Sequence, residues 1–302
     1  MSKLYEKLSV SVLVLGLLPS APVMAEPFLF TTEPATNFIA SATRPASAGK
    51  FEIETGDDFA LTSETVITGA TFTGLLTGAA PTIGEVVVEV YRVFPKDSDV
   101  GRTSGSPTFS TANVPTRVNS PSDVAFDSRD SAEVGELTFT TNTLAASFIA
   151  NNSVQPGGIH PKPNQTTTGN GAVTGTEAEF SVDLTKPLDL PADHYFFVPQ
   201  VGVSGGEFLW LSGQRPVPFP PGFNDLQSWT RDESDGGIFP DWLRIGTDIV
   251  DGDPVPTFNA AFSLSGTMVP EPASSTLLGI ALVGLGALRR RGKSSPTITR
   301  RW

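Results

Sequence analysis

Residues 258–264 read Phe-Asn-Ala-Ala-Phe-Ser-Leu, and the order of apolar and polar residues in this stretch decides the fold class. Apolar residues occupy alternate positions, namely Phe258, Ala260, Phe262 and Leu264. Asn259 and Ser263 lie on the opposite side of the alternation. Successive side chains of a β-strand point to opposite faces, so a period of two predicts a strand with one buried face and one polar face.

The same alternation recurs along the body of the chain. It occurs, with Val, Ile, Phe and Thr enriched, at residues 51–61, 65–76, 86–94, 134–140, 179–184, 195–203, 208–211 and 242–245. Gly, Pro, Asn and Asp cluster between these segments, and no amphipathic helix of three turns is evident outside the chain ends. We therefore expect an all-β domain over residues 26–268, and about nine strands in one domain favour a jelly-roll-like β-sandwich.

Two long segments, residues 95–129 and 151–176, are expected to be irregular. The second is poor in large apolar residues and rich in Gly, Asn and Thr. Insertions of this kind belong on the surface of a domain. They are interpreted as tolerated insertions, and functional loops are the alternative.

The first 25 residues have the three parts of a secretory signal peptide. Lys3 and Lys7 precede an apolar stretch at residues 8–18, and Val-Met-Ala at residues 23–25 supplies the small-residue approach to a cleavage site. The apolar stretch is too short to span a bilayer as a permanent anchor. We therefore expect signal peptidase to cleave after Ala25 and the remainder to be exported.

At the other end, an apolar run lies between a proline-containing motif and a basic cluster. The run covers residues 273–288, and as a helix it would reach roughly 24 Å, slightly short of a hydrocarbon core of about 30 Å. Three arginines follow it and favour a cytoplasmic location for that end, which places the body across the membrane. A buried core helix is the alternative, but the run lacks a polar face.

This end of the chain resembles the PEP-CTERM sorting signal of Gram-negative bacteria, which a membrane-embedded exosortase reads. The residues that carry the resemblance are Val269, Pro270, Glu271, Pro272, Arg289, Arg290 and Arg291. The resemblance implies an exported protein that the helix within residues 269–291 anchors transiently in the inner membrane, and that is then found at the cell surface or outside the cell. Residues 292–302 form a short basic tail, longer than such signals usually have.

The body is also similar to a loose class of secreted bacterial β-sandwiches that often carry this signal. The similarity rests on residues 56–61, 67–74 and 258–266, which chiefly encode strands and turns. No catalytic residue is carried over with it. The sorting family implies association with exopolysaccharide or biofilm.

Charge and composition exclude several classes of function. With residues 1–25 and the chain after residue 272 set aside, 12 basic and 31 acidic side chains remain, a formal charge of −19. Such a field repels nucleic acid and anionic membrane surfaces, so nucleic-acid binding is excluded. The sequence has no cysteine, which excludes disulfides, thiolate metal sites and cysteine nucleophiles.

No catalytic constellation is recognisable, so we expect a protein that is not an enzyme. The histidines, His160 and His194, are interpreted as surface residues, and neither an HExxH helix nor a GxSxG elbow is present. The acidic groups interpreted as turn residues and solvated charges are Asp57 with Asp58, Glu207, and Asp232 with Glu233 and Asp235. Glycoside hydrolysis needs only two carboxylates about 5 to 9.5 Å apart, so a carbohydrate-active hydrolase is the alternative.

One segment is a candidate cation site. Asp248, Asp251 and Asp253 surround a turn at Gly252, and calcium prefers oxygen-rich turns. The spacing departs from that of an EF-hand loop, so a plain turn between strands is the other interpretation. A calcium ion here would be structural, and no other cofactor is expected.

Aromatic residues suggest how the domain binds carbohydrate. Trp210 and Trp242 lie in apolar stretches and are expected in the core, whereas Trp229, in Gln-Ser-Trp-Thr-Arg-Asp, is the surface candidate on which a sugar ring stacks. We therefore expect an exported cell-surface or extracellular-matrix protein, associated with exopolysaccharide, that binds carbohydrate weakly. The alternatives are the hydrolase and an ice-binding protein, which needs a repetitive threonine array that the sequence lacks.

Overall fold

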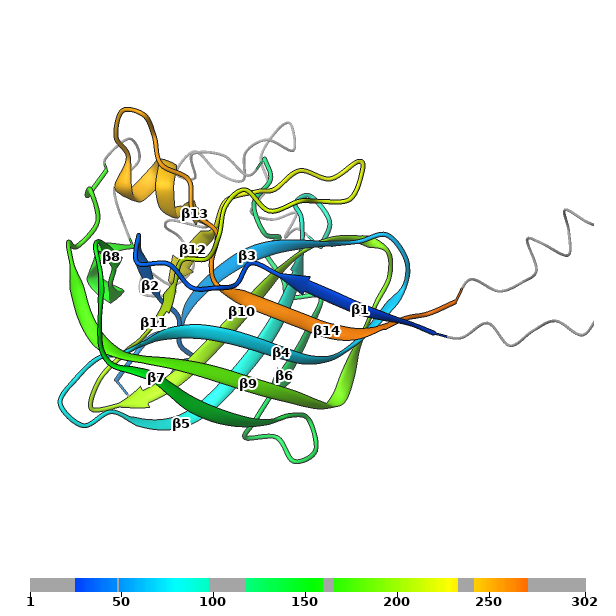
Figure 1. Ribbon diagram of the computed structural model, residues 1–302, viewed down its shortest axis with the longest axis horizontal. Helices are drawn as coiled ribbons and strands as arrows, with labels where there is room; N and C mark the ends of the chain where they lie inside the picture. Colours follow the sequence, from blue (N-terminus) through cyan, green and yellow to red (C-terminus); the bar gives the residue numbers. More distant parts are fainter. Residues whose placement is uncertain (1–24, 48, 98–117, 160–165, 233–241, 271–302) are drawn as a thin grey trace, which may run out of the picture.

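The computed structural model describes residues 25–47, 49–97, 118–159, 166–232 and 242–270 (Figure 1). Within these residues the regular structure is almost entirely β-strand, so the prediction of an all-β fold class is confirmed. The helical segments of the described chain are a 3-10 turn, η1 (Pro156–Gly158), and a π-helical segment, η2 (Ile245–Val250). The strands predicted at residues 65–76 and 208–211 have the same bounds in the structure.

The strands form two sheets. The larger contains β1 (Glu26–Thr31), β2 (Ala40–Ala42), β4 (Thr65–Leu76), β7 (Thr138–Ala150), β8 (Ser153–Val154), β9 (Val173–Leu190), β11 (Phe208–Leu211) and β14 (Phe262–Met268). The smaller contains β3 (Ile53–Leu61), β5 (Thr82–Arg92), β6 (Asp127–Asp130), β10 (Asp193–Ser204), β12 (Trp229–Asp232) and β13 (Leu243–Arg244). The larger sheet runs β1-β14-β4-β11-β2-β8, with β9 paired to both β4 and β7, and the smaller runs β13-β12-β3-β10-β5-β6. β2 and β8 are parallel, and the other strand pairs are antiparallel.

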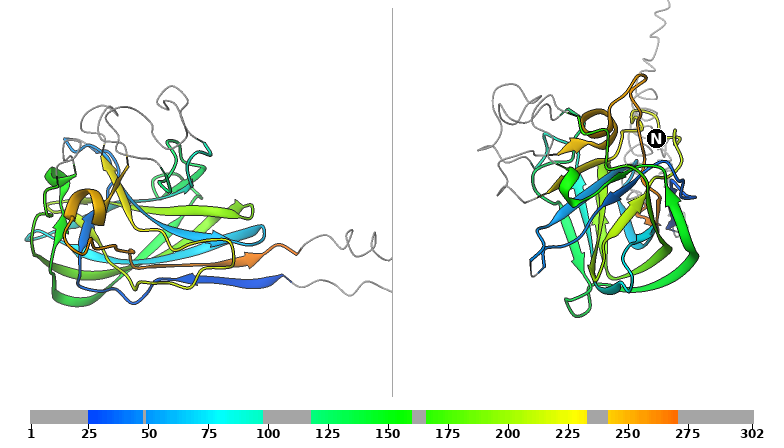
Figure 2. Two further views of the ribbon diagram at one scale, coloured as in Figure 1. Left: turned by 90° about the horizontal axis from the view of Figure 1, so that it is seen from above. Right: turned by 90° about the vertical axis from the view of Figure 1, so that its left-hand side faces the viewer.

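The main core lies between the two sheets, which form two layers (Figure 2). Phe72, Phe180 and Phe262 come from the larger sheet and Phe59 and Phe197 from the smaller, and all five are fully buried. The rings of Phe197 and Phe262 stack across the layers with centroids 5.2 Å apart. Burial of such rings, at about 25 cal/mol per Å² of apolar surface, is the main force that holds the layers together without disulfides.

The stretch at residues 258–264 is only partly a strand. β14 begins at Phe262, and Phe262 and Leu264 face the core as predicted. Asn259, which the alternation places on a polar face, is 1% exposed. Its side chain donates to Asp225 Oδ1 at 2.9 Å and accepts from Arg215. Asn259 is buried with polar partners rather than on an open polar face, because the residues before β14 lie against the loop between β11 and β12.

Other predicted boundaries also move. β7 covers residues 138–150 rather than 134–140, and only two residues of the segment 242–245 belong to β13 before η2 begins. β9 starts at Val173 and so takes in the end of the segment 151–176 that was expected to be irregular. β9 pairs with β4 on one edge and with β7 on the other, so backbone hydrogen bonds hold its polar start. A pattern of alternating apolar residues does not predict such bonds.

Both ends of the described chain lie at the same end of the molecule (Figure 1). β1 and β14 run antiparallel, with Glu26 opposite Met268. No helix in the described residues is long and apolar enough to cross a membrane. The apolar run at residues 273–288 lies outside them.

Candidate functional site

Most of the sorting motif lies outside the described residues, as do residues 1–24 of the signal peptide and His160. The motif residues concerned are Glu271, Pro272, Arg289, Arg290 and Arg291. Val269 and Pro270 follow β14, and the amide of Val269 donates to the Glu64 carbonyl at 2.8 Å. Sorting and export therefore stay predictions from the sequence.

Trp229 is buried, so it is no platform for a sugar ring. It is 1% exposed and begins β12 opposite Gly56 of β3, within an apolar cluster on the outer face of the smaller sheet. The prediction of an exposed Trp229 is wrong because its polar neighbours, Ser228 and Thr230, are themselves buried and hydrogen-bonded to β3. Trp210 and Trp242 are buried, as their apolar surroundings predict.

The three aspartates of the calcium hypothesis do not converge. Asp248 lies in η2, where its carboxylate accepts from Arg244 Nε at 2.9 Å and from an Nη of the same side chain at 2.6 Å. Asp251 and Asp253 are exposed beyond the end of η2. No group of three acidic or histidine side chains in the described chain is placed to hold a metal ion. With Asp248 paired to Arg244, these three aspartates form no metal-binding group in the described chain, and calcium stays a prediction from the sequence.

Asp57 and Asp58 are buried in the middle of β3 rather than solvated in a turn. Asp57 is 0% exposed and accepts from Ser228 Oγ at 3.0 Å and from the Ala260 amide at 2.9 Å. Asp58 points to the opposite face, where its Oδ2 lies 2.7 Å from His194 Nε2. Burial raises the pKa of both carboxyls. The interpretation of Asp57 and Asp58 as solvated turn residues is therefore wrong, and the side chain of His194, interpreted as a surface residue, is only 13% exposed.

Of the other acidic candidates, the structure describes Glu207 and Asp232. Glu207 forms ion pairs at 2.8 Å with Arg44 and with Lys50. Asp232 is 4% exposed at the end of β12. Glu233 and Asp235 lie outside the described residues.

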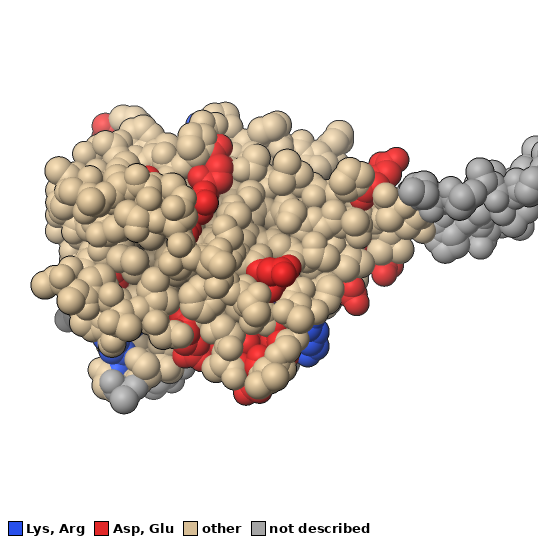
Figure 3. Space-filling model, turned by 60° about the horizontal axis from the view of Figure 1, so that its bottom comes forward, with Lys and Arg blue, Asp and Glu red and all other residues tan. Residues whose placement is uncertain are grey.

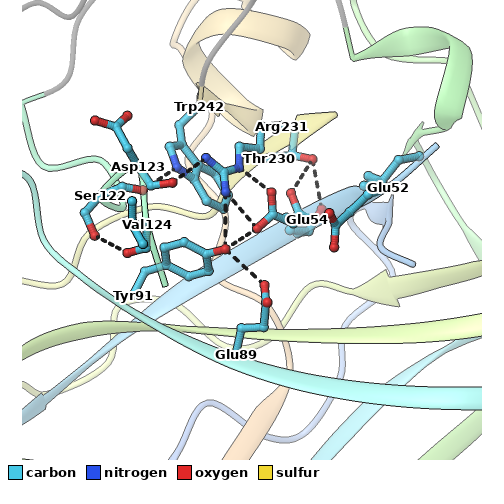
Figure 4. Close-up of polar contacts among 12 residues, drawn as sticks. Glu52, Glu54, Glu89, Tyr91, Ser122, Asp123, Val124, Thr230, Arg231 and Trp242 are labelled. Carbon is cyan, nitrogen blue, oxygen red and sulfur yellow. Dashed lines mark hydrogen bonds and ion pairs between the residues drawn. The ribbon is translucent and has the colours of Figure 1, made fainter. Parts of the chain in front are cut away.

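The outer face of the smaller sheet carries a charged cluster that the sequence analysis did not single out (Figure 4). The cluster, here called the Arg231 cluster, comprises Glu54 of β3, Glu89 and Tyr91 of β5, Arg231 of β12, and Trp242. Arg231 donates to both carboxylate oxygens of Glu54, and its guanidinium carbon lies 4.6 Å from the centroid of the Trp242 ring. Glu54 is only 2% exposed, so its charge is neutralised within the protein rather than by water.

Two carboxyl groups of the Arg231 cluster meet at one phenol. The Tyr91 hydroxyl donates to Glu54 Oε1, and Glu89 Oε2 lies 3.0 Å from the same phenol oxygen. A phenol has one proton, so the second bond is satisfied when Glu89 keeps its own proton and donates it. Burial, with repulsion from Glu54 and Glu52, raises the pKa of Glu89 to about 8.

Two carboxyl groups that contact one hydroxyl are a possible acid and base pair, but the packing around them is closed. Tyr91 Oη lies between the two carboxyls, where a scissile bond would have to enter. The cluster also fastens the segment before β6 to the sheet, because Trp242 Nε1 donates to the Ser122 carbonyl at 2.9 Å. The sequence gives one signal of this cluster. Glu89 and Tyr91 are two residues apart in a predicted strand, which places both side chains on one face.

A hollow of about 680 Å³ opens where three irregular segments meet. We call it the Phe38 hollow; it is lined by Thr36, Phe38, Gly213, Gln214, Arg215, Pro216, Pro256, Thr257, Phe258 and Asn259. Main-chain hydrogen bonds join the segments: the Gly213 amide donates to the Asn259 carbonyl at 2.7 Å and the Thr36 amide to the Ser212 carbonyl at 2.6 Å. The hollow is thus built on a hydrogen-bonded frame.

The wall of the Phe38 hollow is aromatic and polar without excess charge. Phe38 is 59% exposed, and Gln214 and Thr257 are exposed beside it. Arg215 pairs with Asp225 at 3.3 Å and also donates to Asn259, so its charge is compensated. An exposed ring with amide and hydroxyl groups around it suits a sugar, whose CH groups stack on the ring and whose hydroxyls bond to the rim.

Comparisons of the chain with known protein families, with curated proteins and with solved structures find no match. The function is therefore inferred from the chain and its geometry.

Proposed function

We propose that this chain is an exported cell-surface or extracellular-matrix protein whose jelly-roll-like β-sandwich body binds neutral polysaccharide at the Phe38 hollow. The observation that carries the proposal is the exposed Phe38 ring in a hollow of about 680 Å³ with a polar rim. Exosortase, acting at the motif around Glu271, would deliver the protein to the matrix that contains this polysaccharide.

Electrostatics favour a neutral glycan over an acidic one. Asp and Glu far outnumber Lys and Arg on the face shown in Figure 3, in keeping with the net charge of the whole chain, −12. Arg215, the one Lys or Arg among the described residues that line the hollow, is already paired with Asp225. An anionic polysaccharide would meet repulsion without a free cation in the hollow to offset it.

Phe38→Ala is expected to weaken binding to a neutral glycan roughly threefold to tenfold, the range that loss of one stacked ring gives. A glycan array followed by titration of the best ligand measures the effect. Because the ring is largely exposed, the midpoint of unfolding should stay close to that of the wild type.

Leu144→Ala on β7 is the matched control, since Leu144 is 48% exposed but lies outside the hollow. It is expected to bind like the wild type. Equal binding by the Phe38 and Leu144 variants, or no binding of any glycan by the wild type, would rule out the hollow as the site.

The prediction of export is separate from that of glycan binding, because it depends on the two ends of the chain. Mass mapping of the protein recovered from the cell surface or medium is expected to find Glu26 at the N-terminus. Glu271→Ala is expected to block sorting while leaving thermal unfolding of the body unchanged, since Glu271 lies beyond β14. Full-length chain in the cytoplasm with both ends intact would contradict it.

A hydrolase is the second candidate, favoured by the carboxyl groups of Glu54 and Glu89 that meet at Tyr91 in the Arg231 cluster; a glycan would have to displace Tyr91 Oη to reach them. Its test is release of reducing sugar from the glycans that bind. Release that Glu89→Gln abolishes while binding persists would transfer the function to this cluster. Absence of release supports a binding role.

A further inference from the structure

β1 lies at an edge of the larger sheet, with β14 as its strand neighbour in the described chain. In an antiparallel pair, residues alternate between those bonded to the partner strand and those whose main-chain groups point away from it. The Thr32 amide donates to the Phe262 carbonyl at 2.9 Å, which sets this alternation. Phe28 and Phe30 therefore bond toward β14, and the main-chain groups of Pro27, Leu29 and Thr31 point to the open edge.

This edge has few of the usual protections against strand pairing, although Phe219 of the loop after β11 lies against the ring of Phe30. β1 has no charged residue after Glu26, its ladder with β14 has no register shift, and Leu29 is 71% exposed. The other edges are protected: the ladder of β7 is interrupted by two register shifts, β6 carries Asp127, Arg129 and Asp130, and β8 and β13 are only two residues long. β1 is thus the edge best suited to accept another strand.

We propose that β1 pairs with β1 of a second copy of this chain, antiparallel about a two-fold axis at Leu29. In that register the two Leu29 residues exchange N–H and C=O bonds, and the Thr31 amide of each copy donates to the Pro27 carbonyl of the other. The pairing makes about four hydrogen bonds. Pro27 has no N–H to lose, and the bonds that β1 makes to β14 are untouched.

The side chains of β1 are also self-complementary in this register. The two Leu29 side chains lie side by side on the outer face, where each covers apolar surface that is now exposed. On the core side, Phe28 of each copy lies opposite Phe30 of the other, and both rings are only partly buried in the single chain. Glu26 lies outside the paired residues. The interface of a closed two-fold dimer must be complementary to itself, and β1 meets this requirement.

The acidic body opposes this association. Two copies that each carry a formal charge of −19 over the exported region repel one another, and salt screens that repulsion. The dimer is therefore expected to strengthen as ionic strength rises. An association driven by opposite charges would weaken instead.

Leu29→Cys tests the pairing, because the chain has no other cysteine. Opposed residues of a hydrogen-bonded pair have Cα atoms about 5.5 Å apart, within the range of a disulfide. Mild oxidation of the purified full protein is expected to give a disulfide-linked dimer. Ile149→Cys on β7, 56% exposed at another edge, is the matched control and is expected to stay mostly monomeric.

Light scattering of the wild type, over a range of protein and salt concentrations, provides a readout without cysteine. Leu29→Lys is expected to shift the equilibrium from dimer to monomer. The midpoint of unfolding should stay that of the wild type, because the side chain is exposed. A wild type that is monomeric throughout, with Leu29→Cys cross-linking no faster than Ile149→Cys, would overturn the proposal. Neither outcome bears on the Phe38 hollow, which contains none of these residues.

Discussion

Arg231→Met is expected to destabilise the fold by about 3–5 kcal/mol, the cost of leaving a buried carboxylate without its partner. Arg231 donates to both oxygens of Glu54, which is only 2% exposed. The same substitution removes the hydrogen bond of 3.2 Å that Arg231 donates to Tyr91 Oη. Urea unfolding with linear extrapolation measures the loss.

Arg244→Met is the matched control, since Arg244 also pairs with a carboxylate and lies over a tryptophan ring, that of Trp229. The side chains of Arg244 and Asp248 are 27% and 11% exposed, so water screens the pair and its loss should cost less than about 1 kcal/mol. The double variant Arg231→Met with Glu54→Gln should recover much of the stability, because no unpaired charge is then buried. An Arg231→Met variant no less stable than Arg244→Met would contradict this account.

The layers of the fold could be predicted from the sequence because they depend on local periodicity. Residues 70–73 of Thr65–Leu76 alternate apolar and polar side chains, and β4 has the predicted bounds. Fully buried strands gave a weaker signal. In β3 every residue from Ile53 to Leu61 is buried, including Asp57 and Asp58, because one face meets the main core and the other lies under the outer cluster.

The charged sites could not be predicted, because they form between residues far apart in the chain. Glu54 and Arg231 are 177 positions apart and meet only because β12 pairs with β3. Polar neighbours suggested that Trp229 was exposed, but those neighbours are buried against β3. Burial of a polar residue depends on its partners, which one sequence does not reveal.

The Phe38 hollow was missed for a related reason. Its wall comes from segments before β2, after β11 and before β14, none of which alternates. Phe38 lies in an irregular stretch, where an aromatic residue gives no sign of whether it is exposed. Only the hydrogen bonds between these segments bring it beside Gln214 and Thr257.

Stability is expected to fall as the pH rises from about 5 to about 8, and Glu89→Gln should remove part of that fall. The Glu89 carboxyl titrates at about 8 in the folded protein against an ordinary value of 4.5. Between those values the unfolded chain releases a proton that the folded protein keeps. The free energy of unfolding therefore falls by at most about 1.4 kcal/mol per pH unit because of this group. Below 4.5 both states hold the proton and above 8 neither does, so the contribution of Glu89 levels off on either side.

The groups that face Glu89 are Glu52 and Glu54 of the β3 side, Tyr91, and Arg231 of β12, and Glu89→Gln leaves all of them in place. Glutamine keeps a donor toward Tyr91 but has no proton to release, so urea unfolding at pH 5, 6, 7 and 8 should give a shallower decline than in the wild type. Glu133→Gln, at an exposed position between β6 and β7, is expected to decline like the wild type. Some slope should persist in every variant, because burial also raises the pKa of Asp57 and Asp58 and tilts the profile in the same direction. Equal slopes for the Glu89 and Glu133 variants would mean that Glu89 is ionised in the folded protein and that the phenol hydrogen bond is satisfied in another way.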